Sequence, residues 1–158
     1  MRSTRLGLIL GALLTFGCLA RPQVQGPYLV SVEPGLEYQG LHNGLARTIE
    51  FGPECLLEEV LVRHVAAHEI GHALGCSHQP APSIMASRHG LGEAPIYSLT
   101  RIEEAAAKAA ARRGQVVEVR VDPAKGTGAI RAWTEYAVDW ACALWNQAAG
   151  AVVVRRVP

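Results

Sequence analysis

The sequence has few aromatic residues, little net charge and no internal repeat. Of its 158 residues 6% are aromatic, and the formal net charge is +1 without any run of basic residues. This balance argues against a nucleic-acid-binding surface, which needs clustered lysine and arginine. The lack of a repeat or a low-complexity segment excludes a repeat array. With 49% hydrophobic residues, the chain has enough apolar material for the core of a single domain.

The chain also lacks an apolar run long enough to serve as a stable membrane-spanning anchor. Its most apolar stretch, residues 6–16, is too short for that role. It follows Arg2 and Arg5, and a short apolar run after basic residues is typical of an export signal. We therefore predict that residues 1–20 direct export, and that residues 21–158 form one domain.

Two cleavage sites fit this export signal. The segment Leu14–Cys18 resembles a bacterial lipobox, with Thr15 where such boxes usually carry leucine, and it would make Cys18 the lipidated first residue. Ordinary cleavage after Ala20 is the alternative. The first prediction places the protein in a bacterial cell envelope as a lipoprotein, and the second makes it a secreted protein. Membrane contact is expected only in the first case, through the N-terminal lipid.

The densest group of chemically active residues lies in segment 68–78, HEIGHALGCSH. His68 and His72 are four residues apart, so on a helix their side chains lie on one face. Two imidazoles at this spacing can bind one Zn²⁺, each at about 2.0–2.1 Å. Glu69 is rotated off this line, where its carboxylate can reach a metal-bound water and transfer its proton.

Gly75 and His78 complete the candidate site. We predict that Gly75 ends the helix, because a residue tolerant of positive φ lets the chain turn sharply. That turn would bring His78 back to the same metal as a third nitrogen ligand. The fourth position would stay open for water, as in a catalytic zinc site.

The pattern HExxHxxGxxH, with Met85 seven residues after His78, resembles the metzincin zinc endopeptidases. In that family Ser83–Ala86 would be the Met-turn, whose methionine lies beneath the zinc without binding it. The resemblance implies a zinc-dependent endopeptidase that acts as a monomer on extended protein or peptide substrates. The alternatives are an exported zinc-binding lipoprotein that cleaves nothing, and a surface helix with incidental histidines.

Other residues refine this resemblance. Astacin-like and serralysin-like members carry a tyrosine two residues after the methionine; this chain has Ser87 there and is closer to the matrixins. By the same resemblance, Ala86–Leu91 would wall the substrate pocket. His64, one helical turn before His68, is interpreted as a core histidine or as a support for the ligands. His42 and His89 are interpreted as isolated surface histidines.

Helices and strands are expected as follows. Strands are predicted at Tyr28–Val32 and Thr48–Phe51, with turns at Gly35, Gly40 and Gly44, and the active-site helix is predicted to start near Glu54 or Cys55. Thr100 and Glu103 form a capping box that opens a helix to about Arg113, which Gly114 ends.

Three cysteines remain if Cys18 is lipidated. Cys55 and Cys76 lie at opposite ends of the predicted active-site helix, about 27 Å apart. This distance exceeds the roughly 7 Å that a disulfide allows between Cα atoms. Either an intramolecular disulfide uses Cys142, or all three are small buried thiols.

The C-terminal part, residues 115–158, is predicted to form a strand at 116–121, a helix from Ile130 to Ala148 and a strand at 151–154. The helix has one apolar face that we expect to be buried, formed by Ile130, Trp133, Ala137, Trp140, Ala141, Leu144 and Ala148. This C-terminal part resembles the strand–helix–strand unit that opens a matrixin domain, which suggests a circular permutation; an unrelated extension is the alternative. We expect the two strands to be parallel neighbours and the two long helices to pack beneath one sheet. The predicted fold is α+β: a metzincin-like twisted mixed sheet on two long helices, with a further helix after the Met-turn.

Overall fold

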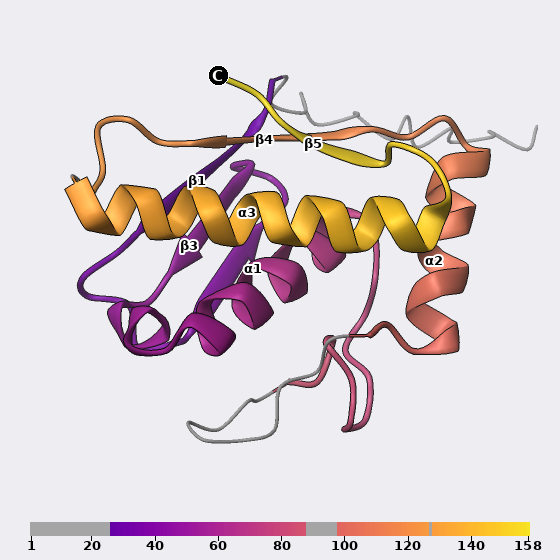
Figure 1. The fold of residues 1–158 in the computed structure, drawn as a ribbon, viewed down its shortest axis with the longest axis horizontal. Coiled ribbons are helices and arrows are strands. Elements are labelled where there is room, and N and C mark those ends of the chain that lie inside the picture. Colours follow the sequence, from indigo (N-terminus) through magenta and orange to yellow (C-terminus); the bar gives the residue numbers. More distant parts are fainter. Residues whose placement is uncertain (1–25, 88–97, 127) are drawn as a thin grey trace, which may run out of the picture.

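A computed structural model describes residues 26–87, 98–126 and 128–158. Within them the fold is α+β, with one mixed sheet and three α-helices (Figure 1). No helix of this described part is long and apolar enough to cross a membrane. In chain order the elements are β1 Tyr28–Val32, β2 Gly40–Asn43, β3 Thr48–Phe51, the 3₁₀ helix η1 Pro53–Leu57, α1 Glu59–Ala73, α2 Arg101–Arg112, β4 Val117–Val121, α3 Gly128–Ala149 and β5 Val154–Arg156.

The five strands lie in the order β2-β3-β1-β4-β5. β1 is parallel to both β3 and β4, and β5 is parallel to β4, whereas β2 runs antiparallel to β3 at one edge. Parallel neighbours need a long crossover, and α3 supplies it between β4 and β5. The predicted parallel pairing within the C-terminal unit is therefore confirmed.

One face of the sheet carries the core. Apolar side chains alternate along the strands, so those of β1, β3 and β4 that point to this face are buried: Tyr28, Val30, Ile49, Phe51, Val117, Val119 and Val121. Helices α1 and α3 pack against this part of the sheet and against each other. Figure 1 shows α3 lying across α1, with α2 near the C-terminal end of α3. The expected packing of two long helices on one sheet is confirmed.

The buried face of α3 differs from the predicted one at its start. Ile130 and Trp133 were expected to be buried, but they are 43% and 40% exposed. The Trp145 indole donates a hydrogen bond of 2.9 Å to the Ala67 carbonyl on α1, and this bond fixes the rotation of α3 about its axis. The residues buried by that rotation are Thr134, Ala137, Val138, Ala141, Cys142 and Trp145.

Two predicted boundaries are wrong. The active-site helix starts at Glu59, because Pro53 opens a separate 3₁₀ turn and Glu58 has an extended backbone. The last strand starts at Val154 rather than Ala151. The Asn146 side chain accepts hydrogen bonds from the N–H groups of Val153 and Val154. These N–H groups therefore bond to a side chain rather than to a neighbouring strand.

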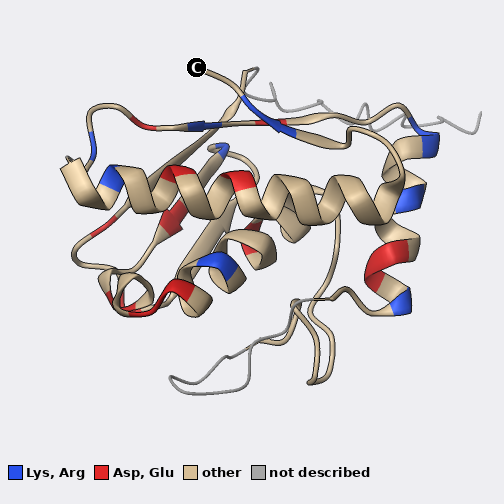
Figure 2. Cartoon of the chain, in the orientation of Figure 1, with Lys and Arg blue, Asp and Glu red and all other residues tan. Residues whose placement is uncertain are grey.

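The last strand is also held to its neighbours by charge. Arg156 donates two hydrogen bonds, of 2.7 and 2.8 Å, to Asp139 on α3. Arg155 donates to Glu118 on β4. Figure 2 shows these basic residues in blue on β5, near red acidic residues of α3 and β4. Such exposed pairs contribute little energy each, so apolar burial remains the main stabilising term.

The three described cysteines, Cys55, Cys76 and Cys142, are free thiols. Cys55 and Cys142 are buried and Cys76 is half-buried. The interpretation as thiols rather than a disulfide is therefore the one that the structure supports. Burial raises the pKa of all three, to about 12 for Cys55 and Cys142 and about 11 for Cys76.

The start of β1 and the end of β5 lie in one row of the sheet. Tyr28 is level with Val119, and Val119 is level with Arg156. Two strand spacings separate the outer members of this row, or about 10 Å. A short linker can span that distance, so the end of the C-terminal unit can be joined to the start of β1.

This geometry gives the first prediction. A chain that ends at Gly114 should fail to fold, because it loses β4 and α3 and exposes the apolar faces of β1 and α1. A chain with residues 115–158 moved ahead of Pro27, joined by a short flexible linker, should unfold cooperatively near the wild-type temperature in circular dichroism. Cooperative unfolding of the chain ending at Gly114 would contradict this.

Candidate metal centre

Three histidines converge at the C-terminal end of α1. His68 and His72 lie on successive turns of the helix, and His78 lies in the segment that follows. The ligand atoms of all three are within 4.8 Å of one another. The Nε2 atom of His72 is 3.1 Å from that of His68 and 3.2 Å from that of His78. The three histidines predicted as ligands can therefore bind one metal ion.

Hydrogen bonds on the far side of two rings determine what these nitrogens can do. His68 Nδ1 is 2.7 Å from the Ile84 carbonyl oxygen, and His72 Nδ1 is 2.9 Å from the Cys76 carbonyl oxygen. A carbonyl only accepts, so both Nδ1 atoms carry the proton. In the neutral rings both Nε2 atoms then present lone pairs.

Facing lone pairs at this distance repel unless a cation lies between them. A tetrahedral site with Zn–N bonds of about 2.0–2.1 Å places its nitrogens about 3.3–3.4 Å apart. The observed spacings are close to this value, so the three imidazoles fit zinc. Imidazole also suits copper, iron and nickel, and the geometry alone does not select among them.

Gly75 ends the ligand helix as predicted. Its φ is +93°, and the N–H of the next residue, Cys76, bonds to the Gly71 carbonyl at 2.9 Å. Gly75 N–H bonds to the His72 carbonyl, which completes a Schellman motif. This turn positions the Cys76 carbonyl under His72 and directs the chain back toward the metal site at His78.

The segment predicted to be the Met-turn lies directly beneath the ligand helix. Ala86 N–H bonds to the Ser83 carbonyl, which closes the turn, and Met85 is fully buried. A Cβ atom at Gly71 would overlap the Met85 sulfur and the Trp145 ring. Glycine at this position therefore lets α1 pack closely on the turn that holds His68.

Glu69 is buried next to the ligands. It is 5% exposed and faces β2, where a Cβ atom on Gly40 would collide with its carboxylate and with Val65. Burial raises the pKa of Glu69 to about 7, and a hydrogen bond from the His42 backbone N–H lowers it in part. A carboxyl group with this pKa can both accept and release a proton near neutral pH.

The ligands and Glu69 line one cleft of about 780 Å³. Edge strand β2 lines one part of it, and Ala86 and Ser87 line another. The other lining residues are Glu37, Tyr38, Gln39, Glu54, His64 and Val65. Of the predicted pocket wall Ala86–Leu91, residues 88–91 lie outside the described residues.

The predictions for the other histidines, His64, His42 and His89, have different outcomes. His64 is 5% exposed and lines the cleft, so its interpretation as a core histidine is confirmed, whereas its interpretation as a support for the ligands stays a prediction. The interpretation of His42 as a surface histidine is wrong, because it is half-buried and its ring lies against that of His72. His89 lies outside the described residues, as do Cys18 and the predicted export signal.

One buried carboxylate links the turn to α2. Glu103 is 1% exposed and accepts hydrogen bonds from Ser83 Oγ, Met85 N–H and Thr100 N–H, at 2.7, 2.9 and 2.6 Å. Burial would raise the pKa of Glu103, but these bonds outweigh it and hold the pKa below its ordinary value. The predicted capping box with Thr100 is confirmed, and Glu103 also fixes the turn.

Comparison with known proteins finds no matching family model, no matching curated protein and no matching solved structure. The functional argument therefore rests on the geometry of the cleft.

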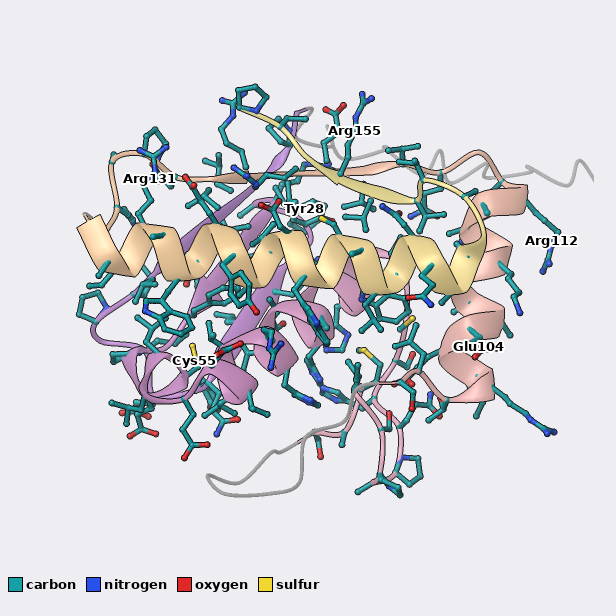
Figure 3. The ribbon with its side chains drawn as sticks, in the orientation of Figure 1. Tyr28, Cys55, Glu104, Arg112, Arg131 and Arg155 are labelled. Carbon is teal, nitrogen blue, oxygen red and sulfur yellow. The ribbon has the colours of Figure 1, made fainter. Side chains whose placement is uncertain are left out.

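Replacing Glu103 tests its role in the turn. Glu103→Ala leaves the buried Ser83 hydroxyl without its acceptor and removes one of the two acceptors of Met85 N–H, so urea unfolding should show a loss of about 2–4 kcal/mol. Glu104→Ala is the matched control. Glu104, labelled in Figure 3, has a side chain that is 45% exposed, and its replacement should cost under about 0.5 kcal/mol. Equal losses in the two variants would contradict the assignment.

The raised pKa of Glu69 predicts how metal-free stability depends on pH. Because the pKa rises from 4.5 to about 7 on folding, the folded chain binds this proton more tightly, and stability falls as pH rises through that range. The loss is about 3 kcal/mol in total. The free energy of unfolding is measured for both proteins in the presence of a chelator at pH 5 and pH 8. The stability of Glu69→Gln relative to the wild type should rise by about this amount from pH 5 to pH 8. A pH-independent difference would refute the prediction.

Proposed function

We propose that this protein is a zinc-dependent endopeptidase of the metzincin type. The observation that carries the proposal is the convergence of three imidazole Nε2 atoms beside a buried carboxylate in an open cleft. A structural zinc site has four protein ligands, whereas the described residues gather three here. This arrangement favours catalysis over a purely structural role.

Zinc held by His68, His72 and His78 would polarise the substrate carbonyl and lower the pKa of a water molecule toward about 7. Glu69 would remove a proton from that water and later donate it to the leaving amine. In the metal-free chain burial raises the pKa of Glu69 to about 7, so the group changes its protonation state near neutral pH. Burial beside β2 holds the carboxylate in place for both steps.

Edge strand β2 supports an extended peptide as the substrate. It pairs with β3 on one side only, and it ends the sheet among the described residues. Its outer backbone groups can hydrogen-bond to an added strand, which would then run past the metal site. Gly40, Leu41 and His42 of this strand all line the cleft.

The family assignment and the export of the protein are parts of this proposal. The C-terminal unit lies beside β1, and the row Tyr28, Val119 and Arg156 puts the end of this unit close to the start of β1. This proximity supports the circular permutation of a matrixin-like domain. Export, as a lipoprotein through Cys18 or by cleavage after Ala20, is proposed from the sequence alone.

The decisive experiment separates metal binding from catalysis. The zinc-loaded wild type should cleave a labelled unfolded protein. Glu69→Gln should retain about one zinc per chain and lose activity about 10²- to 10⁴-fold, since only the proton transfer is removed. His78→Ala should lose zinc, as measured by elemental analysis.

Glu54→Gln is the matched control, because Glu54 is an exposed carboxylate that lines the same cleft. Its activity should stay near that of the wild type. A wild type that holds zinc and cleaves nothing would support the zinc-binding lipoprotein instead. Equal activity of wild type and Glu69→Gln would reject the assignment of Glu69.

A further inference from the structure

A column of side chains approaches the metal centre from the sheet and ends on His72. The Arg47 guanidinium carbon lies 4.2 Å from the centre of the Tyr28 ring. The Tyr28 ring centre is 5.2 Å from that of His42, with the planes inclined by 31°. The His42 ring centre is 5.9 Å from that of His72, with an inclination of 29°. These separations are in the range of favourable aromatic contacts.

The members of this column come from separate segments of the chain. Tyr28 opens β1 and is labelled in Figure 3, His42 lies on β2, and Arg47 precedes β3. Arg47 has a φ of +54°, a left-handed backbone that no other non-glycine residue of the described part adopts. Its carbonyl accepts a hydrogen bond from Leu29 N–H, which ties it to β1. Such backbone conformations tend to occur at functional sites.

His42 contacts the centre in two ways. Its backbone N–H bonds to the Glu69 carboxylate, and its ring faces the ring of His72. The hydrogen bond from His72 Nδ1 to the Cys76 carbonyl fixes one point of the ligand ring but leaves its tilt about that bond open. A flat ring against its face restricts that tilt.

We propose that His42, backed by Tyr28 and Arg47, is a positioning residue that holds the His72 ring in its ligating orientation. This inference rests on the metal centre of the proposed function, and it does not require peptidase activity. The contact acts through ring shape, so a flat apolar ring in place of His42 keeps the effect and a branched side chain of similar size loses it.

The test is Co²⁺ binding to the metal-free full chain, followed by visible absorbance. His42→Leu should weaken binding about 10-fold or more, in line with the effect of residues that orient metal ligands. His42→Phe should stay within about 3-fold of the wild type, because it keeps a flat ring. Leu45→Ala is the control: Leu45 lies between β2 and β3, is 68% exposed and is not among the residues that line the cleft. Its affinity should be unchanged.

Equal Co²⁺ affinities of the Phe and Leu variants, whether near wild type or both weakened, would overturn the proposal. His42→Gln gives the same ring-free comparison if the Leu variant does not fold, as judged by circular dichroism. A wild type that binds Co²⁺ with the predicted order of affinities but cleaves no peptide would refute the proposed function and leave this inference intact. A wild type that binds no Co²⁺ would overturn both.

Discussion

The hydrogen bonds from His68 and His72 to the carbonyls of Ile84 and Cys76 set the direction of the ligating nitrogens. Both carbonyls belong to segments that follow α1, so the helix alone does not prepare the site. The turn at Gly75 must form to place the Cys76 carbonyl, and the Ser83–Ala86 turn must form to place that of Ile84. The candidate metal centre therefore depends on the whole segment from α1 to α2. Glu103 on α2 completes it by accepting hydrogen bonds from the second turn.

Two glycines allow the rest of the fold to pack closely against this segment. Gly71 lets α1 contact Met85 and Trp145, and Gly40 lets β2 lie against Glu69. A side chain at either position would separate these parts, because a packed interior has no free volume to absorb it. The burial that raises the pKa of Glu69 thus depends on a residue without a side chain on the neighbouring strand.

The sequence alone predicts those features whose signal is local. Ligand spacing follows from the period of a helix, the end of α1 from Gly75, and the capping box from Thr100 and Glu103. Features set by distant contacts were missed. Because Gly40 and Gly44 were interpreted as turn residues, β2 was not predicted, and neither was the position of His42 beside His72. The rotation of α3 depends on Trp145 contacting Ala67, and the start of β5 depends on Asn146; neither contact has a signal in the pattern of apolar residues.

The site lies in one short segment of the sequence, whereas the elements that support it do not. The order of the elements along the chain therefore matters little to the candidate metal centre. The ligands, the helix end and the Met85 turn all lie within residues 68–86, whereas the supporting strands come from both ends of the described chain. The site needs α3 against α1 and β1 between β3 and β4, but it does not need α3 or β1 to come first in the sequence. Because β5 ends in the same row of the sheet in which β1 begins, the chain can start with the C-terminal unit or with β1 and keep every strand pair. A rearranged connectivity is then compatible with an unchanged site, since the same strands and helices enclose it in both orders.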